Sequence, residues 1–234
     1  MLSLAHAAGQ VISYIDMCQA WSVSFQKGMH FHLRPNLSVL LMSRRANAPY
    51  RDHVEENGRV LVYEGHDAPR KRGAPDPKSV DQPRSTTNGT LTENGLFERA
   101  AIAIKAGHAS PQVVAVYEKI HAGIWAFNGF FRLTDCWQQS DGVRRVFKYR
   151  LELADDLDVQ PAPGDTLTHT RLIPSAVKLE VWQRDKGQCT ICGEKNNLHF
   201  DHDLPYSKGG SSITAKNIRL LCAHHNLAKS DKIE

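Results

Sequence analysis

Short apolar segments separated by turns dominate residues 31–153 and predict a β-rich region. Four segments rich in β-branched and aromatic residues, with partial alternation, favour strands at 39–42, 59–65, 124–137 and 144–153. Apolar positions at helical spacing predict short helices at 4–15, 96–105, 111–121 and 175–186. The mixture predicts an α+β fold.

A polar stretch, residues 154–170, divides the chain. It contains two prolines and no hydrophobic periodicity, which is typical of an interdomain linker. We therefore expect a helical extension at 1–30, a β-rich domain at 31–153 and a smaller domain at 171–234. A second polar stretch, residues 68–90, contains four prolines and five Lys or Arg residues. It is either a solvated loop or an arm that contacts phosphates.

The composition is that of a globular protein with a small basic surplus. The 234 residues are 41% hydrophobic and carry a formal net charge of +4, which permits nucleic-acid binding without requiring it. No apolar run approaches the length of a membrane span, and the N-terminal segment lacks a basic start and contains Asp16, so we expect no membrane anchor and no signal peptide. The odd count of five cysteines argues for a reducing compartment.

Two cysteine-containing pairs near the C-terminus predict a zinc site. Cys189 and Cys192 form a Cys-x-x-Cys pair, and after 29 intervening residues Cys222 and His225 form a Cys-x-x-His pair. Each pair can sit on a tight turn, and four such ligands are what tetrahedral zinc requires. A lone Cys-x-x-Cys could be a redox pair or chance, but the second pair favours structural zinc, which also stabilises a domain with a thin core.

A longer pattern runs through these pairs. It reads C-x2-C, then D-H-x-x-P-x-x-x-G-G from Asp201, N-I-R-L-L-C from Asn217, and C-x2-H-N up to Asn226. Over about residues 173–231 this pattern resembles the HNH endonucleases, whose ββα-metal fold wraps two strands and a helix around one cation. The resemblance implies a metal-dependent enzyme that hydrolyses DNA.

The chemistry assigns a role to each motif residue. Phosphodiester hydrolysis needs an activated water and a Lewis acid, and the neutral imidazole of His202 suits a general base near pH 7. The resemblance implies that Asp201 and Asn226 bind a catalytic Mg²⁺ or Mn²⁺, ions that prefer oxygen ligands. It implies that Asn217 hydrogen-bonds across the loop between the two strands and holds the His202 strand. Many family members carry a final His at the position of Asn226, so this is an H-N-N variant, which favours magnesium over nickel or zinc as the catalytic ion.

Other polar residues nearby have weaker assignments. We expect His199 and His224 to be packing or surface residues. Lys208 and Arg219 read as solvated charges. Lys229, one turn beyond the last motif residue, is a candidate phosphate ligand.

The β-rich region carries a second resemblance, over about residues 31–153. The segments PYRDHVEENGRVLVYEG (49–65), TLTENGLFERA (90–100), WAFNGFFRL (125–133) and FKYRLEL (147–153) resemble, in this order, the SRA or YDG domain. This implies a twisted β-barrel with flanking helices that flips a modified cytosine out of duplex DNA, at a stacking cost that aromatic faces can offset. Tyr50 and Tyr63 are then the expected sandwich around the base, and Asp52, or His53 one position later, the expected acceptor of the cytosine N4 amine.

Together the two resemblances predict an endonuclease that restricts foreign double-stranded DNA carrying 5-methylcytosine or 5-hydroxymethylcytosine, in the bacterial cytoplasm. One alternative is an HNH nuclease that reads unmodified sequence. Another is a non-enzymatic DNA-binding protein that uses the zinc module as a scaffold, although the trio Asp201, His202 and Asn226 argues against it. Because one HNH module cuts one strand, we also expect a homodimer, with the N-terminal helix as one candidate interface.

Overall fold

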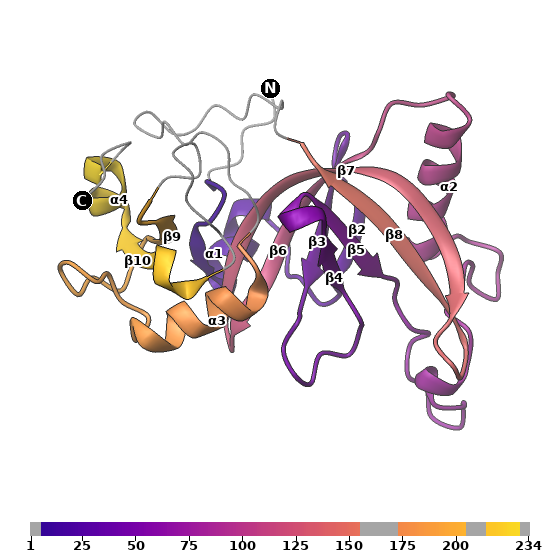
Figure 1. Cartoon of the computed structure of the whole chain (residues 1–234). Helices are drawn as coiled ribbons and strands as arrows, with labels where there is room; N and C mark the ends of the chain where they lie inside the picture. The colour runs from indigo at the N-terminus through magenta and orange to yellow at the C-terminus, as the bar shows by residue number, and fades with distance from the viewer. Residues whose placement is uncertain (1–5, 155–172, 205–213, 230–234) are drawn as a thin grey trace.

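The computed structural model describes residues 6–154, 173–204 and 214–229. The fold is α+β, as predicted: strands form one large curved sheet and a separate hairpin, and four helices pack around them (Figure 1). The strands are β1 (Val11–Ser13), β2 (Met29–Arg34), β3 (Leu37–Met42), β4 (His53–Glu55), β5 (Val60–Glu64), β6 (Val113–His121), β7 (Ile124–Ser140), β8 (Arg145–Leu153), β9 (Leu198–His202) and β10 (Ile218–Cys222). The helices are α1 (Tyr14–Trp21), α2 (Glu93–Lys105), α3 (Ser175–Arg184) and α4 (Ala223–Lys229), with short 3-10 turns η1 (Glu56–Gly58), η2 (Pro77–Ser79) and η4 (Ala215–Asn217).

The large sheet has eight strands in the order β2-β3-β6-β7-β8-β5-β4, with β1 added to one end of β7. Only the β3–β6 pairing is parallel among these strands. The long strand β7 spans the sheet from the C-terminal part of the chain to the distant β7–β8 turn (Figure 1). The four strands predicted from sequence are confirmed as parts of β3, β5, β7 and β8.

The helix predicted at 111–121 is wrong, because this segment is strand β6. Val113, Val114 and Val116 are β-branched and favour extended backbone. The strand lies between β3 and β7, and residues 114–118 are all buried. A strand that is buried on both faces shows a continuous apolar run rather than alternation, so periodicity alone does not separate it from a buried helix.

The N-terminal helix predicted at 4–15 is also displaced. Residues 1–5 lie outside the described residues, residues 11–13 form β1 beside β7, and helix α1 begins only at Tyr14. The Ser13 side chain accepts a hydrogen bond from the Asp16 N–H and caps this helix. Helices α2 and α3 confirm the predictions at 96–105 and 175–186 within a few residues at each end.

Three groups of buried side chains form the core. One lies between helix α2 and the sheet, and another lies between helix α1 and the sheet. The third is shared by the two parts of the chain: Val11, Ile120 and Ala126 of the sheet pack with residues of α3, β9 and β10. The C-terminal module (residues 173–204 and 214–229) is therefore packed against the sheet. In the described part of the chain, no helix is long and apolar enough to cross a membrane.

Candidate functional site

The four predicted zinc ligands converge on one point of the C-terminal module. Cys189 and Cys192 lie on the turn after α3, Cys222 ends β10, and His225 lies in the first turn of α4. All four ligand atoms lie within 4.8 Å of one another. These residues could hold a metal ion.

The spacing of the ligand atoms fits zinc. The Sγ atoms of Cys192 and Cys222 are 3.8 Å apart, and His225 Nδ1 lies 3.3 Å from Cys222 Sγ and 3.5 Å from Cys189 Sγ. A tetrahedral zinc ion with ordinary bond lengths gives edges of about 3.8 Å between sulfurs and about 3.5 Å between sulfur and nitrogen. Burial alone would raise the pKa of Cys189, but main-chain N–H groups of Cys192 and Cys222 that face its sulfur lower it to about 6. The thiolate form that a metal needs is thus favoured.

The candidate catalytic residues lie on a strand hairpin and the helix that follows it. Asp201 and His202 are the last two residues of β9, which pairs antiparallel with β10. Helix α4 follows β10 directly, packs against β9, and carries Asn226, which is buried. Asp201 and His202 thus lie at the end of the hairpin where β9 ends and β10 begins, and Asn226 lies on the helix that packs against β9.

Asn217 ties the two sides of this hairpin together. Its Oδ1 accepts a hydrogen bond from the Leu204 N–H at 2.8 Å, and its Nδ2 donates to the Leu204 carbonyl at 3.0 Å. Its own carbonyl accepts from the Asp203 N–H at 2.8 Å. Asn217 therefore holds the chain immediately after His202, which is the role of a residue that positions the strand rather than one that reacts.

Lys229 is close to Asp201. Its side chain is only 3% exposed, its Nζ lies 2.5 Å from Asp201 Oδ2, and it also donates to the His202 carbonyl. The buried ammonium neutralises the Asp201 carboxylate and occupies its Oδ2. In this arrangement Lys229 is directed at the candidate metal ligand instead of outward to solvent.

Burial lowers the pKa of His202. The nearby Lys229 ammonium lowers it as well, whereas the Asp201 carboxylate raises it by a smaller amount than burial lowers it. The imidazole is therefore neutral at pH 7, the form that a general base needs. His199 is buried on β9, His224 is exposed with its ring 5.1 Å from that of His225, and Arg219 pairs with Asp203. Lys208 lies outside the described residues.

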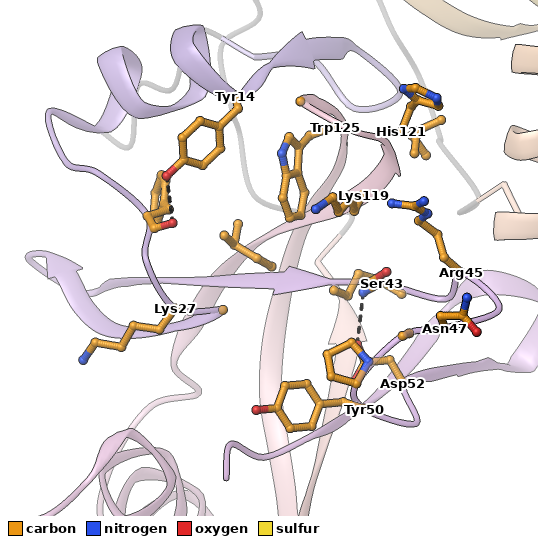
Figure 2. A pocket seen from close by; sticks show the side chains of 18 of the residues that line it. Tyr14, Lys27, Ser43, Arg45, Asn47, Tyr50, Asp52, Lys119, His121 and Trp125 are labelled. Carbon is orange, nitrogen blue, oxygen red and sulfur yellow. Dashed lines mark hydrogen bonds between the residues drawn. The ribbon is translucent and has the colours of Figure 1, made fainter. Parts of the chain in front are cut away.

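A cleft of about 1090 Å³ lies beside the sheet and reaches the C-terminal module. Tyr50, Asp52 and Tyr63, the three residues predicted to hold a base, all line it. Its other wall includes Leu179 and Gln183 of helix α3. Figure 2 shows Lys119 and Arg45 beside Trp125, with Tyr50 and Asp52 on the other side of the segment that carries Ser43.

The ring stacked on Tyr50 is that of His66. The two rings are 5.2 Å apart with an interplanar angle of 13°. Lys78, in the loop 68–90, places its Nζ 4.4 Å from the centre of the Tyr50 ring and 2.8 Å from Asp67. One basic residue of this loop thus packs on the candidate base pocket. Burial lowers the pKa of His66 to about 4, so its ring is neutral.

Tyr63 lies deeper than Tyr50. Its side chain is almost fully buried, and its hydroxyl faces the carbonyls of Gly28 and Leu41 at 3.3 Å and His66 Nε2 at 3.2 Å. Gly28 borders the same space: a Cβ there would lie 2.9 Å from the Tyr63 hydroxyl and 3.0 Å from His66 Nε2. The absence of a side chain at Gly28 keeps this part of the cleft open.

Asp52 is fully buried beside the cleft. Its carboxylate accepts hydrogen bonds from the main-chain N–H groups of Glu64 at 3.0 Å and Ser43 at 3.2 Å (Figure 2 shows the second). Burial nevertheless raises the pKa of Asp52 to about 7. The alternative acceptor, His53, is exposed and hydrogen-bonded to Glu55.

Sequence reasoning missed His66, Arg45 and Lys119 as cleft residues. His66 follows the YEG segment directly, so its position beside the predicted pocket was a usable signal. Arg45 and Lys119 come from segments far apart in the chain, and only the pairing of β3 with β6 brings those segments together.

Comparison with known proteins locates one family in the chain. Residues 189–232 match the model of the HNH endonucleases, whereas none of the curated proteins matches the chain. Among solved structures, this chain is similar to the SRA domain of SUVH5 in complex with hemi-methylated CG DNA. The match covers 65% of the length of this chain and 89% of the length of the SUVH5 chain, with 16% identity and a TM-score of 0.42. The same domain bound to fully hydroxymethylated CG DNA is similar over 66% of this chain and 94% of its own, with 15% identity and a TM-score of 0.42. The modification-dependent restriction endonuclease TagI is similar over 97% of this chain and 78% of its own, with 16% identity and a TM-score of 0.41. By its family match, the segment 189–232, which contains the four Cys and His ligands together with His202, is an HNH endonuclease module.

Proposed function

We propose that this protein is a modification-dependent DNA endonuclease, which reads a modified cytosine with its β-rich part and hydrolyses a phosphodiester bond with its HNH module. The observation that carries the proposal is the shared cleft. The residues predicted to hold a base line one wall, and helix α3, which leads into the module, lines the other. A DNA strand held there contacts both parts of the chain.

In the nuclease module, His202 accepts a proton from the attacking water and Asn217 holds the end of β9 in place. Asp201 and Asn226 would hold Mg²⁺ or Mn²⁺, which supplies the Lewis acidity for the scissile phosphate. The buried ammonium of Lys229 on Asp201 supports a cation-attracting position there. Lys229 contacts the phosphate only after it leaves Asp201. Zn²⁺ at the Cys189, Cys192, Cys222 and His225 cluster stabilises the module.

In the base pocket, Tyr50 supplies an aromatic face that His66 now covers, and Asp52 supplies a buried acceptor. We infer that a flipped cytosine displaces His66 from Tyr50, because rings 5.2 Å apart leave no room for a base between them. Tyr63 then forms the floor through its buried ring. The Asp52 carboxylate accepts from the cytosine N4 amine, which thymine lacks. Arg45 and Lys119 in the same cleft suit the phosphates of the flipped strand.

The test is cleavage of matched duplexes that carry cytosine, 5-methylcytosine or 5-hydroxymethylcytosine at one position, with Mg²⁺ present. We expect cutting of the modified duplexes and little cutting of the unmodified one. Equal cutting of all three supports a nuclease that reads unmodified sequence. Binding without cutting of any duplex supports the scaffold alternative.

We further propose that the active form is a homodimer, because a double-strand break needs two HNH sites. Analytical ultracentrifugation with and without a modified duplex tests this. A monomer under both conditions, together with efficient double-strand cutting, contradicts it.

A further inference from the structure

The nuclease module joins the sheet through a buried polar network as well as through apolar packing. Lys178 of helix α3 places its Nζ 2.7 Å from Glu118 Oε2 on β6 and 2.5 Å from Asn128 Oδ1 on β7. Asn128 in turn donates to Glu118 Oε2 at 3.1 Å. The side chains of Lys178 and Glu118 are each 2% exposed. Three elements are thus tied at one point.

Such a network defines one orientation. Apolar side chains tolerate small slides against one another, whereas buried charges need their partners at hydrogen-bond distance and angle. Burial alone would raise the pKa of Glu118, but the Lys178 ammonium lowers it below its ordinary value. The carboxylate is therefore ionised at neutral pH, and rotation of α3 would leave it buried without a counter-charge.

A second attachment lies on the other side of the module. Gln10 forms an isolated antiparallel bridge with His199, and the Phe200 N–H donates to the Gly9 carbonyl at 3.0 Å. The next residues of the N-terminal segment form β1, which pairs with β7 of the sheet. Strand β9, which ends in Asp201 and His202, is therefore joined to the sheet through main-chain hydrogen bonds.

Both attachments lie next to residues of the cleft or of the candidate catalytic site. Glu118 precedes Lys119, and Lys178 precedes Leu179, and both Lys119 and Leu179 line the cleft. Phe200 precedes Asp201 on β9. We propose that the Lys178–Glu118–Asn128 network is a positioning device that fixes the HNH module relative to the base pocket, so that the cut falls at a set distance from the modified cytosine. This inference rests on the proposed function.

The alternative is a module restrained mainly by its tether. For comparison, an unstructured chain of 18 residues, the number between Ala154 and Ile173, would have a root-mean-square span of about 21–25 Å. At about 3.4 Å per base step this corresponds to roughly six to seven positions along the DNA. A fixed module cuts within one or two positions, so the two cases differ measurably.

The experiment uses the full chain and the double substitution Glu118→Leu with Lys178→Met. Replacing both charges by apolar side chains of similar size avoids an unpaired buried charge. The buried Asn128 amide loses both network partners and keeps its contact with Met42 Sδ at 3.6 Å, so thermal unfolding checks that the variant folds.

The matched control is Lys105→Met, which removes the exposed ion pair of Lys105 with Asp135 at 2.7 Å, away from the junction. Three properties are measured for each protein: zinc content, thermal unfolding and affinity for a 5-methylcytosine duplex. Zinc content and affinity are expected to stay within twofold of wild type, and thermal unfolding is expected to show a folded protein.

The main readout is the distribution of cut positions on an end-labelled duplex with one 5-methylcytosine. We expect wild type and Lys105→Met to cut within one or two positions. The double variant, which keeps the β9 attachment and the apolar contacts, is expected to cut over more positions than wild type, with about six as the upper bound set by the covalent connection. An equally narrow distribution for a double variant that folds and cuts overturns the proposal, and so does a broad distribution for wild type.

Small-angle X-ray scattering without DNA provides a second readout that needs no cleavage. The double variant is expected to have a larger radius of gyration than wild type and Lys105→Met, and an unchanged value counts against the network. If wild type cuts modified and unmodified duplexes equally, the proposed function fails. The scattering result still decides whether the network fixes the module.

Discussion

The substitution Asp52→Asn tests how the pocket selects cytosine. Asparagine has the shape of aspartate and the hydrogen-bonding pattern of the protonated acid, with one acceptor and one donor side. Ionised Asp52 can accept the cytosine N4 amine in a charge-assisted hydrogen bond. Such a bond contributes about 1.5–3 kcal/mol, whereas the neutral acceptor that asparagine keeps contributes about 0.5–1.5 kcal/mol. The difference, about 1–1.5 kcal/mol, corresponds to about a 5- to 12-fold loss of affinity at about 1.4 kcal/mol per tenfold. We expect that loss at pH 8.5, where the carboxyl is ionised.

The pKa of Asp52 gives this prediction a characteristic pH profile. Because burial raises this pKa to about 7, the wild-type carboxyl is largely protonated at pH 5.5 and then matches asparagine. The affinity ratio between wild type and Asp52→Asn for a 5-methylcytosine duplex should therefore fall toward one between pH 8.5 and 5.5. Fluorescence anisotropy at constant ionic strength measures it.

The contribution of Asp52 to folding stability changes with pH in the opposite direction to its contribution to binding. The folded-state pKa lies above the value of 3.8 expected for the unfolded chain, so the contribution of Asp52 to stability is fully present below about pH 4 and is lost as the pH rises through 7. The free energy of unfolding of wild type relative to Asp52→Asn should decline over that range. A pH-independent affinity ratio refutes the reasoning, and so does an affinity loss in His53→Ala that exceeds the loss in Asp52→Asn.

Three further predictions concern the metal sites and the pocket. Substitution Cys192→Ser should lower the bound zinc from one equivalent per chain and destabilise the module, as metal analysis and thermal unfolding would show; an unchanged melt with no zinc bound contradicts a structural role. His202→Ala should abolish cutting in Mg²⁺ but leave duplex affinity unchanged, whereas Asn217→Ala should reduce cutting and also loosen the hairpin, which hydrogen exchange at residue 204 would report; full cutting by His202→Ala would rule out this base. Gly28→Val should weaken binding of modified duplexes at least tenfold, because its side chain would enter the space beside the Tyr63 hydroxyl; binding at the wild-type level would show that the base lies elsewhere in the cleft.

Local chemistry made the nuclease module predictable from the sequence. Its zinc ligands occur in two pairs, each with its members three positions apart, and turns and single helices fix such spacings without help from the rest of the chain. The zinc cluster therefore converges where the spacing of Cys189, Cys192, Cys222 and His225 predicts. The α+β class was predictable for a similar reason, since most strands show their own propensity.

Long-range packing made other features unpredictable. Strand β6 reads as a helix because both of its faces are covered by the sheet and its surroundings. The stacking of His66 on Tyr50, and the pairing of Lys178 with Glu118 across 60 positions, depend on how distant segments meet. The polar stretch before α3 predicts an interdomain linker, but it gives no sign that buried residues on its two sides pack into one cluster.

The bridge between Gln10 and His199 has a consequence for how the protein is made. These residues are 189 positions apart, so the segment around Gln10 waits for that length of chain before β9 can dock on it. Contacts of such separation form late, because the chain must close a long loop before the contact stabilises it. Strand β10 and the second pair of zinc ligands, Cys222 and His225, come later still in synthesis. A ribosome-bound chain therefore holds a completed sheet before it holds a docked nuclease, and cutting activity arises only after α4 has been made.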